Sequence, residues 1–138
     1  MSEVRNTQIV KQADDAFARG DINTILNLLD DGVEWEAVIG GEGVVPTAGM
    51  RRGRAAGGEF FQTLNQSVAF ESFEPRQFVA QDDLAVVLGH YRGRGKHNGV
   101  AWETDWVMIF TVRGERIVKF REFTNSALLV RQWLATPA

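Results

Sequence analysis

Glu122 is the residue whose type and position most clearly point to chemistry in this sequence. It follows Phe120 by two positions in a stretch that reads as a β-strand, so the two side chains project from the same face. A carboxylate among aromatic rings is destabilising unless it is paired or used. Two interpretations are open. Glu122 serves as an acid–base group of a pocket, or a neighbour such as Tyr91 or Trp106 holds it in a structural role.

The segment spanning residues 102–123 is expected to position Glu122, because it predicts two long strands joined by a tight turn at Gly114. Its side chains alternate with period two, as in a half-buried antiparallel strand, and Val118 is expected to share a face with Glu122. That face is predicted to form a pocket wall, although the same rings would also serve as ordinary core. The predicted ligand-binding residues are Trp102, Thr104, Trp106, Met108 and Phe120, with Glu34 from an earlier strand.

The bulk composition is that of a soluble globular protein. Hydrophobic residues make up 44% of the 138 residues and charged residues 24%, which favours a single domain over residues 1–138. A net charge of −3 gives no overall attraction to nucleic acid or to an anionic membrane. No apolar run approaches the roughly 20 residues that span a bilayer, and the polar N-terminus shows no signal peptide. We therefore expect a cytoplasmic protein with neither a nucleic-acid nor a membrane partner.

The two histidines, His90 and His97, do not indicate a metal site. Neither has a carboxylate nearby at ligand spacing, and the sequence contains no cysteine. His90 and Tyr91 must lie on opposite faces of their strand, so a Tyr91 that faces the pocket places His90 at the surface. A one-residue change of register would exchange the two.

The predicted elements run in the order two helices, a strand, a helix, several strands and a final helix. Apolar residues recur at helical spacing, beginning with Val4, over residues 4–19, 22–29, 55–64 and 127–134. Further strands are expected at residues 33–39, 68–73, 76–80 and 84–91, of which the second and third can form one strand interrupted at Pro75. The glycine-dense residues 40–53 are expected to form a functional loop or lid. Consecutive strands indicate an α+β fold, in which a curved antiparallel sheet wraps around the N-terminal helices and encloses a pocket.

Four segments carry a family resemblance: GDINTILNLLDDGVEWEAV, MRRGRAAGGEFF, AVVLGHYRGRGK and IVKFREFTNSALL. Together they resemble the SnoaL-like (polyketide-cyclase-like) branch of the nuclear-transport-factor-2-like superfamily, which is related to ketosteroid isomerase and limonene epoxide hydrolase. The resemblance covers nearly the whole chain. It implies a cone-shaped, cystatin-like α+β barrel with an internal pocket, and frequently a homodimer. It does not fix the chemistry, because members include enzymes, binding proteins and scaffolds.

The resemblance carries two acidic residues over as catalytic candidates. Glu36 stands where the acidic pattern of ketosteroid isomerase, here residues 30–36 (DDGVEWE), has its general base. The alternative is that Glu36 lies on a solvated face beside the glycine-dense loop. Glu122 stands at the first acidic position of the epoxide-hydrolase stretch, here residues 121–125 (REFTN), where that enzyme uses the acid to help activate a water.

Other catalytic positions of these two enzymes differ in this sequence. Residues 89–91 (GHY) stand where the epoxide hydrolase has an Arg-x-Asp pair. Ala13 and Trp106 stand where the isomerase has its two oxyanion donors, and an indole N–H can donate only one hydrogen bond. Neither epoxide hydrolysis nor steroid isomerisation is therefore supported residue by residue.

Two functions follow from these patterns. The first is an isomerase- or cyclase-like enzyme that transfers a proton on a small apolar carbonyl compound without a cofactor. Glu122 or Glu36 would be its base, and Tyr91 or Trp106 its hydrogen-bond donor. The second is a non-catalytic ligand-binding or dimeric scaffold module of the same fold.

The outer face of the predicted sheet is the expected homodimer interface. Lys119 and Arg121 project from that face, and Glu103 and Asp105 can offset their charge. The expected partners are therefore a small apolar molecule and a second copy of the chain.

Overall fold

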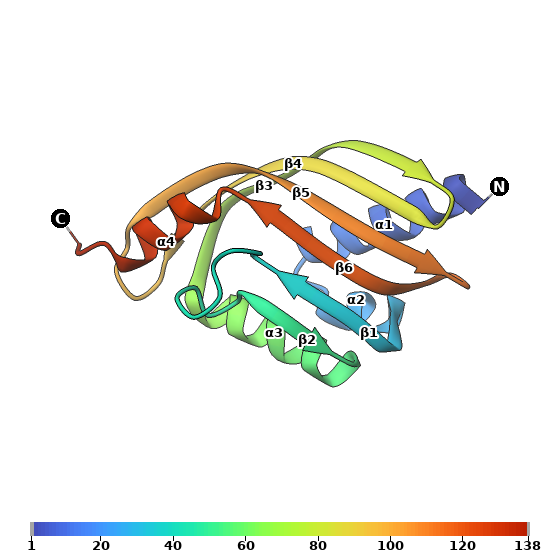
Figure 1. Cartoon of the computed structure of the whole chain (residues 1–138), viewed down its shortest axis with the longest axis horizontal. Coiled ribbons are helices and arrows are strands. Elements are labelled where there is room, and N and C mark those ends of the chain that lie inside the picture. Colours follow the sequence, from blue (N-terminus) through green and yellow to red (C-terminus); the bar gives the residue numbers. More distant parts are fainter. Residues whose placement is uncertain (1, 138) are drawn as a thin grey trace.

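The computed structural model describes residues 2–137, which form four helices and six strands (Figure 1). The helices are α1 (Ser2–Ala18), α2 (Ile22–Leu28), α3 (Arg54–Ser67) and α4 (Ser126–Leu134). The strands are β1 (Leu29–Ala37), β2 (Gly49–Arg52), β3 (Val68–Gln81), β4 (Leu84–Gly95), β5 (Ala101–Arg113) and β6 (Arg116–Thr124). This order confirms the α+β class that the sequence predicts.

Small residues set three of the helix boundaries. Gly20 has a φ of +73°, which lets the chain reverse directly after α1. Asp21 then caps α2, because its carboxylate accepts a hydrogen bond from the Thr24 backbone N–H at 3.2 Å. Asn125 caps α4 in the same way, accepting from the Leu128 N–H at 3.2 Å.

The six strands form one curved sheet in the order β2-β1-β6-β5-β4-β3. Every neighbouring pair is antiparallel except β1 and β6, which run parallel. The sheet is therefore mixed, which differs from the fully antiparallel sheet expected from the sequence. The parallel pair is possible because β2, α3 and the strands β3 to β5 lie between β1 and β6 in the chain, a connection far longer than a hairpin.

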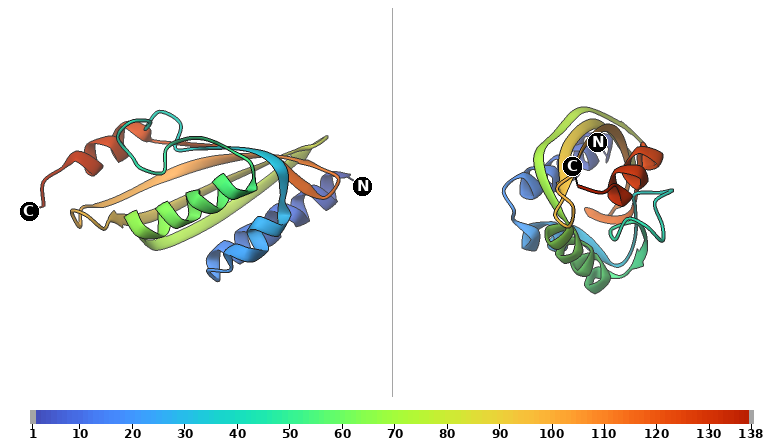
Figure 2. Two further views of the ribbon diagram at one scale, coloured as in Figure 1. Left: turned by 90° about the horizontal axis from the view of Figure 1, so that it is seen from below. Right: turned by 90° about the vertical axis from the view of Figure 1, so that its left-hand side faces the viewer.

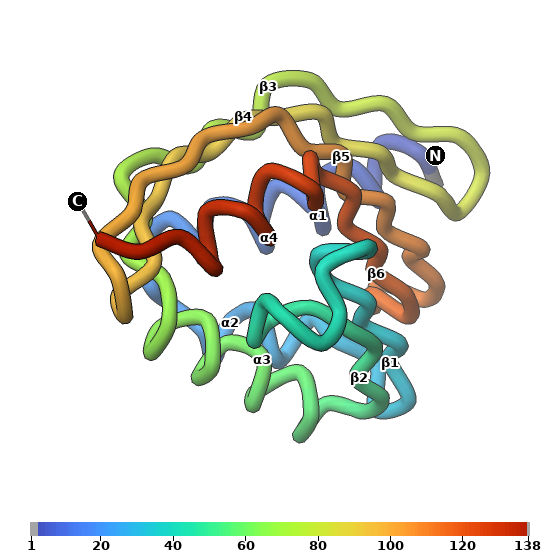
Figure 3. The backbone as a smooth tube through the Cα atoms, turned by 60° about the vertical axis from the view of Figure 1, so that its left-hand side comes forward, coloured from blue at the N-terminus to red at the C-terminus, as the bar shows by residue number. Residues whose placement is uncertain are grey.

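The helices cover the concave face of this sheet. Figure 2 shows α1, α2 and α3 on the same side of the strands, where the apolar core lies. Figure 3 shows α4 at one end of the sheet, beside the loop of residues 38–48 that joins β1 to β2. Gly40 of that loop lies so close to α4 that a Cβ atom at this position would be 2.4 Å from Ser126 Oγ.

Two details of the strands and one of α1 differ from the sequence-based expectation. A bulge between β5 and β6 makes Ile117 fully buried and leaves Val118 half-buried, so Val118 does not share the inner face with Glu122. Residues 68–73 and 76–80 form the single strand β3, as in one of the two predicted arrangements, and its register is irregular at Pro75, which an edge strand tolerates. β2 forms within the glycine-dense segment, where no strand was predicted. On α1, Val4 is 59% exposed and does not belong to the core.

No helix in the described part of the chain is long and apolar enough to cross a membrane.

Candidate functional site

A cavity of about 90 Å³ lies between the concave face of the sheet and the helices. Aromatic and aliphatic side chains form most of its wall, and residues of all four helices contribute to it. Within residues 2–137, its polar lining residues are Asp14, Thr47, Tyr91 and Glu122, and its tryptophans add indole N–H groups. An apolar chamber with a few polar groups is the usual form of a small-molecule site.

Glu122 projects from β6 into this cavity and is held by two hydrogen bonds. Its Oε2 accepts from the Tyr91 hydroxyl of β4 at 2.9 Å, and its Oε1 accepts from the Val38 backbone N–H at 3.1 Å. Tyr91 and Glu122 are 4% and 5% exposed, respectively. They reach each other because β4 and β6 flank β5, and both side chains point to the concave face.

The surroundings of Glu122 favour a proton-accepting carboxylate. Burial raises the pKa of Glu122 above its ordinary value, while the hydrogen bonds from Tyr91 and Val38 act in the opposite direction. Burial and the nearby Glu122 charge raise the pKa of Tyr91, so the phenol stays protonated and acts as a donor. Among the described residues, Glu122 forms no ion pair with a cation. This combination makes a stronger base than an exposed glutamate would be.

The backbone that meets Glu122 is unusual. Val38 has a φ of +45°, a left-handed conformation that β-branched residues rarely adopt. The next residue, Ile39, donates its N–H to the Glu122 backbone carbonyl at 3.1 Å. The loop of residues 38–48 therefore begins with two hydrogen bonds to Glu122, and its buried residues Val45 and Thr47 help to close the cavity.

Asp14 is a second buried carboxyl group in the wall of the cavity, and sequence reasoning missed it. It projects from α1, is 7% exposed, and its Oδ2 has no hydrogen-bond partner among the described residues. Burial, followed by the negative charge of Asp15, raises the pKa of Asp14 to about 7. The signal was present, since Asp14 is four residues after the fully buried Val10 and three before Phe17, on the apolar stripe of α1.

Three of the predicted ligand-binding residues line the cavity, namely Trp102, Met108 and Phe120. Phe120 also stacks on Trp35 with ring centroids 3.8 Å apart, so part of the wall is a rigid aromatic pair. Thr104 is buried but does not line the cavity. Its Oγ1 donates to the Asp105 carbonyl at 2.9 Å instead, next to the start of α4.

Trp106 is buried without lining the cavity, which differs from its predicted role. Its ring lies over Gly89, where a Cβ atom would be 2.3 Å from Trp106 Cζ2, and it stacks on Phe73 at 5.3 Å. The glycine leaves space for the indole on its partner strand, so the ring packs along the sheet. Trp106 is therefore a core residue, and its indole is not a hydrogen-bond donor to the cavity.

Glu34 and Glu36 lie outside the cavity. They alternate with Val33, Trp35 and Ala37, whose side chains are buried on the concave face, so both glutamates point to the outer face. Glu36 Oε1 pairs with Arg121 Nε at 3.2 Å, and Glu34 Oε2 pairs with Arg52 at 2.7 Å. Glu36, a catalytic candidate by its match to the general-base position, therefore does not face the cavity, and the alternative of a solvated face is the observed one.

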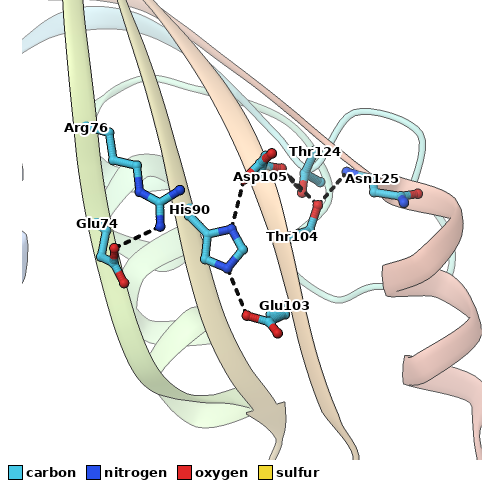
Figure 4. Close-up of polar contacts among 8 residues, drawn as sticks. All are labelled: Glu74, Arg76, His90, Glu103, Thr104, Asp105, Thr124 and Asn125. Atoms are coloured by element: carbon cyan, nitrogen blue, oxygen red, sulfur yellow. Dashed lines mark hydrogen bonds and ion pairs between the residues drawn. The ribbon is translucent and has the colours of Figure 1, made fainter.

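The outer face carries a polar cluster centred on His90, as expected when Tyr91 faces inward. Figure 4 shows the imidazole of His90 between two carboxylates of β5. Its Nε2 is 2.9 Å from Glu103 Oε2 and its Nδ1 is 2.8 Å from Asp105 Oδ1. These two contacts raise the pKa of His90. No group of three or more side chains within residues 2–137 is arranged to hold a metal ion.

Comparison with known proteins places this geometry in a family. Residues 10–120 match the SnoaL-like domain. An NTF2-like protein from Burkholderia xenovorans LB400 is 37% identical, with 96% of this chain and 98% of that chain covered and a TM-score of 0.85. A candidate polyketide cyclase from Xanthomonas campestris pv. campestris is 21% identical, with 96% and 99% covered and a TM-score of 0.78. TerC, co-crystallised with polyporic acid, is 22% identical, with 95% and 99% covered and a TM-score of 0.80. No curated protein sequence matches the chain.

Proposed function

Since the chain belongs to the SnoaL-like family, we propose that it is an isomerase- or cyclase-like enzyme that moves a proton on a small, flat, apolar carbonyl compound. The observation that carries this proposal is the buried Glu122 carboxylate, which lines an apolar cavity and has no cationic partner within the described residues. Among proteins of this fold, TerC has been crystallised with polyporic acid. A small organic molecule is accordingly the ligand class that we propose.

In this mechanism Glu122 is the general base. A carbon acid next to a carbonyl group would lose its proton to a Glu122 oxygen, and the same carboxyl group would return the proton to another carbon of the same molecule. The Tyr91 hydroxyl holds the carboxylate in one orientation through its 2.9 Å hydrogen bond. The aromatic wall, including the stacked Trp35 and Phe120, excludes water and packs against a flat ring.

The experiment that tests this function needs no knowledge of the natural substrate. A general base in an apolar cavity should catalyse exchange of the α-protons of a flat aryl ketone, such as 1-indanone, with D₂O. Proton NMR follows this exchange directly. We expect Glu122→Gln to remove the catalysed exchange, a loss of about 10²- to 10⁴-fold, while circular dichroism shows the fold retained. Glu36→Gln is the matched control, because that glutamate lies on the outer face.

A second function, non-catalytic ligand binding or scaffolding, is favoured by one specific observation. Both Glu122 oxygens already accept hydrogen bonds within the chain, so Glu122 could serve only to tie the loop of residues 38–48 to the sheet. Under this alternative, none of a panel of aryl ketones exchanges faster with the protein than with buffer, and Glu122→Gln mainly lowers the melting temperature.

We also propose a homodimer through the outer face of the sheet. Cross-strand pairs of apolar residues lie on that face, including Leu88 opposite Val107 and Val86 opposite Ile109. Leu88 is 37% exposed. The charges assigned to the interface from the sequence are paired within the chain instead: Arg121 contacts Glu36, while His90 contacts Glu103 and Asp105. The apolar pairs therefore replace the charge pairs as the basis for this interface.

A further inference from the structure

Two polar atoms in the wall of the cavity are buried without a partner. Asp14 Oδ2 and Trp35 Nε1 have no hydrogen-bond partner within residues 2–137, and both side chains line the cavity. Asp14 is 7% exposed and Trp35 is 4% exposed. Buried polar groups are nearly always hydrogen-bonded in folded proteins. A pair of unpartnered groups around one chamber therefore points to a partner that arrives from outside the chain.

Asp14 and Glu122 belong to the same apolar enclosure although they come from different elements. Phe17, one turn after Asp14 on α1, packs against Phe70 with ring centroids 5.7 Å apart. Phe70 in turn packs against Tyr91 at 5.9 Å, and Tyr91 donates to Glu122. The two carboxyl groups thus face one chamber through a continuous aromatic wall.

The environments of the two carboxyl groups assign them different protonation states. Glu122 accepts hydrogen bonds from two donors, an arrangement that suits a charged carboxylate. Asp14 has no donor and no cation beside it within the described residues, and burial raises its pKa to about 7. A protonated Asp14 donates a hydrogen bond, as the Trp35 indole N–H does.

We propose that Asp14 and Trp35 are the recognition groups of the cavity, and that they bind an oxygenated aromatic molecule by donating hydrogen bonds to its carbonyl or other acceptor oxygens. The inference rests on the proposed function for the site but concerns binding, not proton transfer. A plain hydrocarbon of the same shape would leave both donors without a partner.

The test compares two isosteric probes, 1-indanone with its carbonyl oxygen and indane without it. Dissociation constants come from ¹H–¹⁵N NMR titration of the whole protein. We expect the wild type to bind 1-indanone about three- to tenfold more tightly than indane, the effect of one neutral hydrogen bond. Asp14→Leu should reduce this preference towards one, Trp35→Phe should reduce it in part, and Asp14→Asn should retain it because the amide still donates.

Asp15→Asn is the matched control, since Asp15 is exposed on the same helix. It should keep most of the preference, because burial is the larger cause of the raised Asp14 pKa and the Asp15 charge the smaller one. An equal affinity of the wild type for both probes, no detectable binding of 1-indanone, or a preference that survives Asp14→Leu would each overturn the proposal.

The proton-exchange experiment separates the recognition role of Asp14 and Trp35 from the enzymatic function of Glu122. Loss of exchange in Glu122→Gln with an unaltered preference in Asp14→Leu refutes only the recognition role. A preference that depends on Asp14 without any catalysed exchange refutes only the enzymatic function.

Discussion

The Tyr91 hydroxyl and the Glu122 carboxylate form a buried hydrogen bond of 2.9 Å that joins β4 to β6 across β5. It links the centre of the sheet to the loop of residues 38–48, because the other Glu122 oxygen accepts the Val38 N–H. One side chain thus connects the strand that supplies a donor with the loop that closes the cavity. Removing the donor should affect both stability and the ionisation of the carboxyl group.

Tyr91→Phe is expected to destabilise the protein more at pH 8 than at pH 5. The phenol hydrogen bond stabilises the charged form of Glu122, and its loss costs roughly 1.5–3 kcal/mol when that form predominates. Without it the pKa of Glu122 rises further, so the free energy of unfolding falls more steeply with pH. Urea unfolding of the wild type and the variant at both pH values measures this. In Glu122→Gln the same tyrosine substitution should lose its pH dependence, and an equal loss at both pH values would contradict the assignment.

Asp14→Asn is expected to stabilise the protein above neutral pH. Folded Asp14 holds its proton up to about pH 7, whereas the unfolded chain releases it near the ordinary value of 3.8. The folded state therefore binds more protons between these values, and the free energy of unfolding of the wild type falls as pH rises through this window. The pKa difference corresponds to about 4 kcal/mol at pH 8.

Thermal or urea unfolding between pH 4 and pH 8 checks this expectation. The wild type and Asp14→Asn should be similar near pH 4 and diverge towards pH 8. Asp15→Asn, on the exposed side of the same helix, should keep most of the pH dependence of the wild type, because burial is the larger cause of the raised Asp14 pKa and the Asp15 charge the smaller one. Parallel curves for Asp14→Asn and the wild type would show that Asp14 ionises normally.

His90 is expected to titrate above its ordinary value of 6.5, because the carboxylates of Glu103 and Asp105 favour the imidazolium. Glu103→Gln should lower the pKa of His90, measured from the ring protons by NMR. Since the folded-state pKa is the higher one, this stabilising contribution is present at low pH and is lost as pH rises through it. Asp83→Asn, which removes a partner of the distant Arg113, is the control and should leave the His90 titration unchanged.

Gly89→Ala is expected to destabilise the protein by about 1–3 kcal/mol, the usual cost of overpacking a core. The new Cβ would be 2.3 Å from the Trp106 ring and 2.7 Å from the Glu74 carbonyl oxygen, and the backbone oxygen has little freedom to move. Gly58→Ala on α3 is the matched control. Its nearest neighbour, Leu26 Cδ1, would be 3.7 Å away, so alanine should stabilise the helix by about 0.5–1 kcal/mol. Equal effects in urea unfolding would refute the packing argument.

Leu88→Glu is expected to convert a homodimer into a monomer, because it places a charge among the apolar pairs of the outer face. Size-exclusion chromatography with light scattering measures the mass. Leu134→Glu is the control, since Leu134 is 67% exposed on α4, away from the sheet. A monomeric wild type, or a dimer that survives Leu88→Glu, would exclude this interface. Arg121→Glu reverses a charge that is paired with Glu36 on the same face, away from the apolar pairs, and should weaken the dimer less.

The strands that build the site were predictable because apolar and polar side chains alternate along them. Alternation alone placed Glu122 beside Phe120 on the buried face, and it linked an inward Tyr91 to an outward His90. The spacing of residues on α1 also indicated which side of the helix is buried. Asp14 was not predicted as a site residue because an aspartate is normally expected on the solvated side. The spacing from Val10 to Asp14 shows instead that the carboxyl group belongs to the buried stripe.

Two other features had no local signal, whereas the outward direction of Glu36 had one that was not used. The left-handed backbone at Val38 occurs at a β-branched residue, where sequence gives no warning. Trp106 and Trp102 share the inner face of one strand, and their rings lie differently because of contacts with other strands, including Gly89 and Gly93 of β4. Glu36 was predicted as a catalytic base because residues 30–36 match the acidic pattern of ketosteroid isomerase. The alternation of β1 around the buried Trp35 carried the correct information and directed Glu36 outward.

Gly89 and Gly93 of β4 govern more than packing. Gly89 pairs with Trp106 and Gly93 with Trp102, and a Cβ atom at Gly93 would be 2.8 Å from the Trp102 ring. Trp102 lines the cavity, whereas Gly93 does not. The space that this indole occupies thus depends in part on a residue of the neighbouring strand, and so does the shape of the chamber wall. Ligand preference in such a protein can drift during evolution, or be redesigned, while every residue that the ligand touches stays the same.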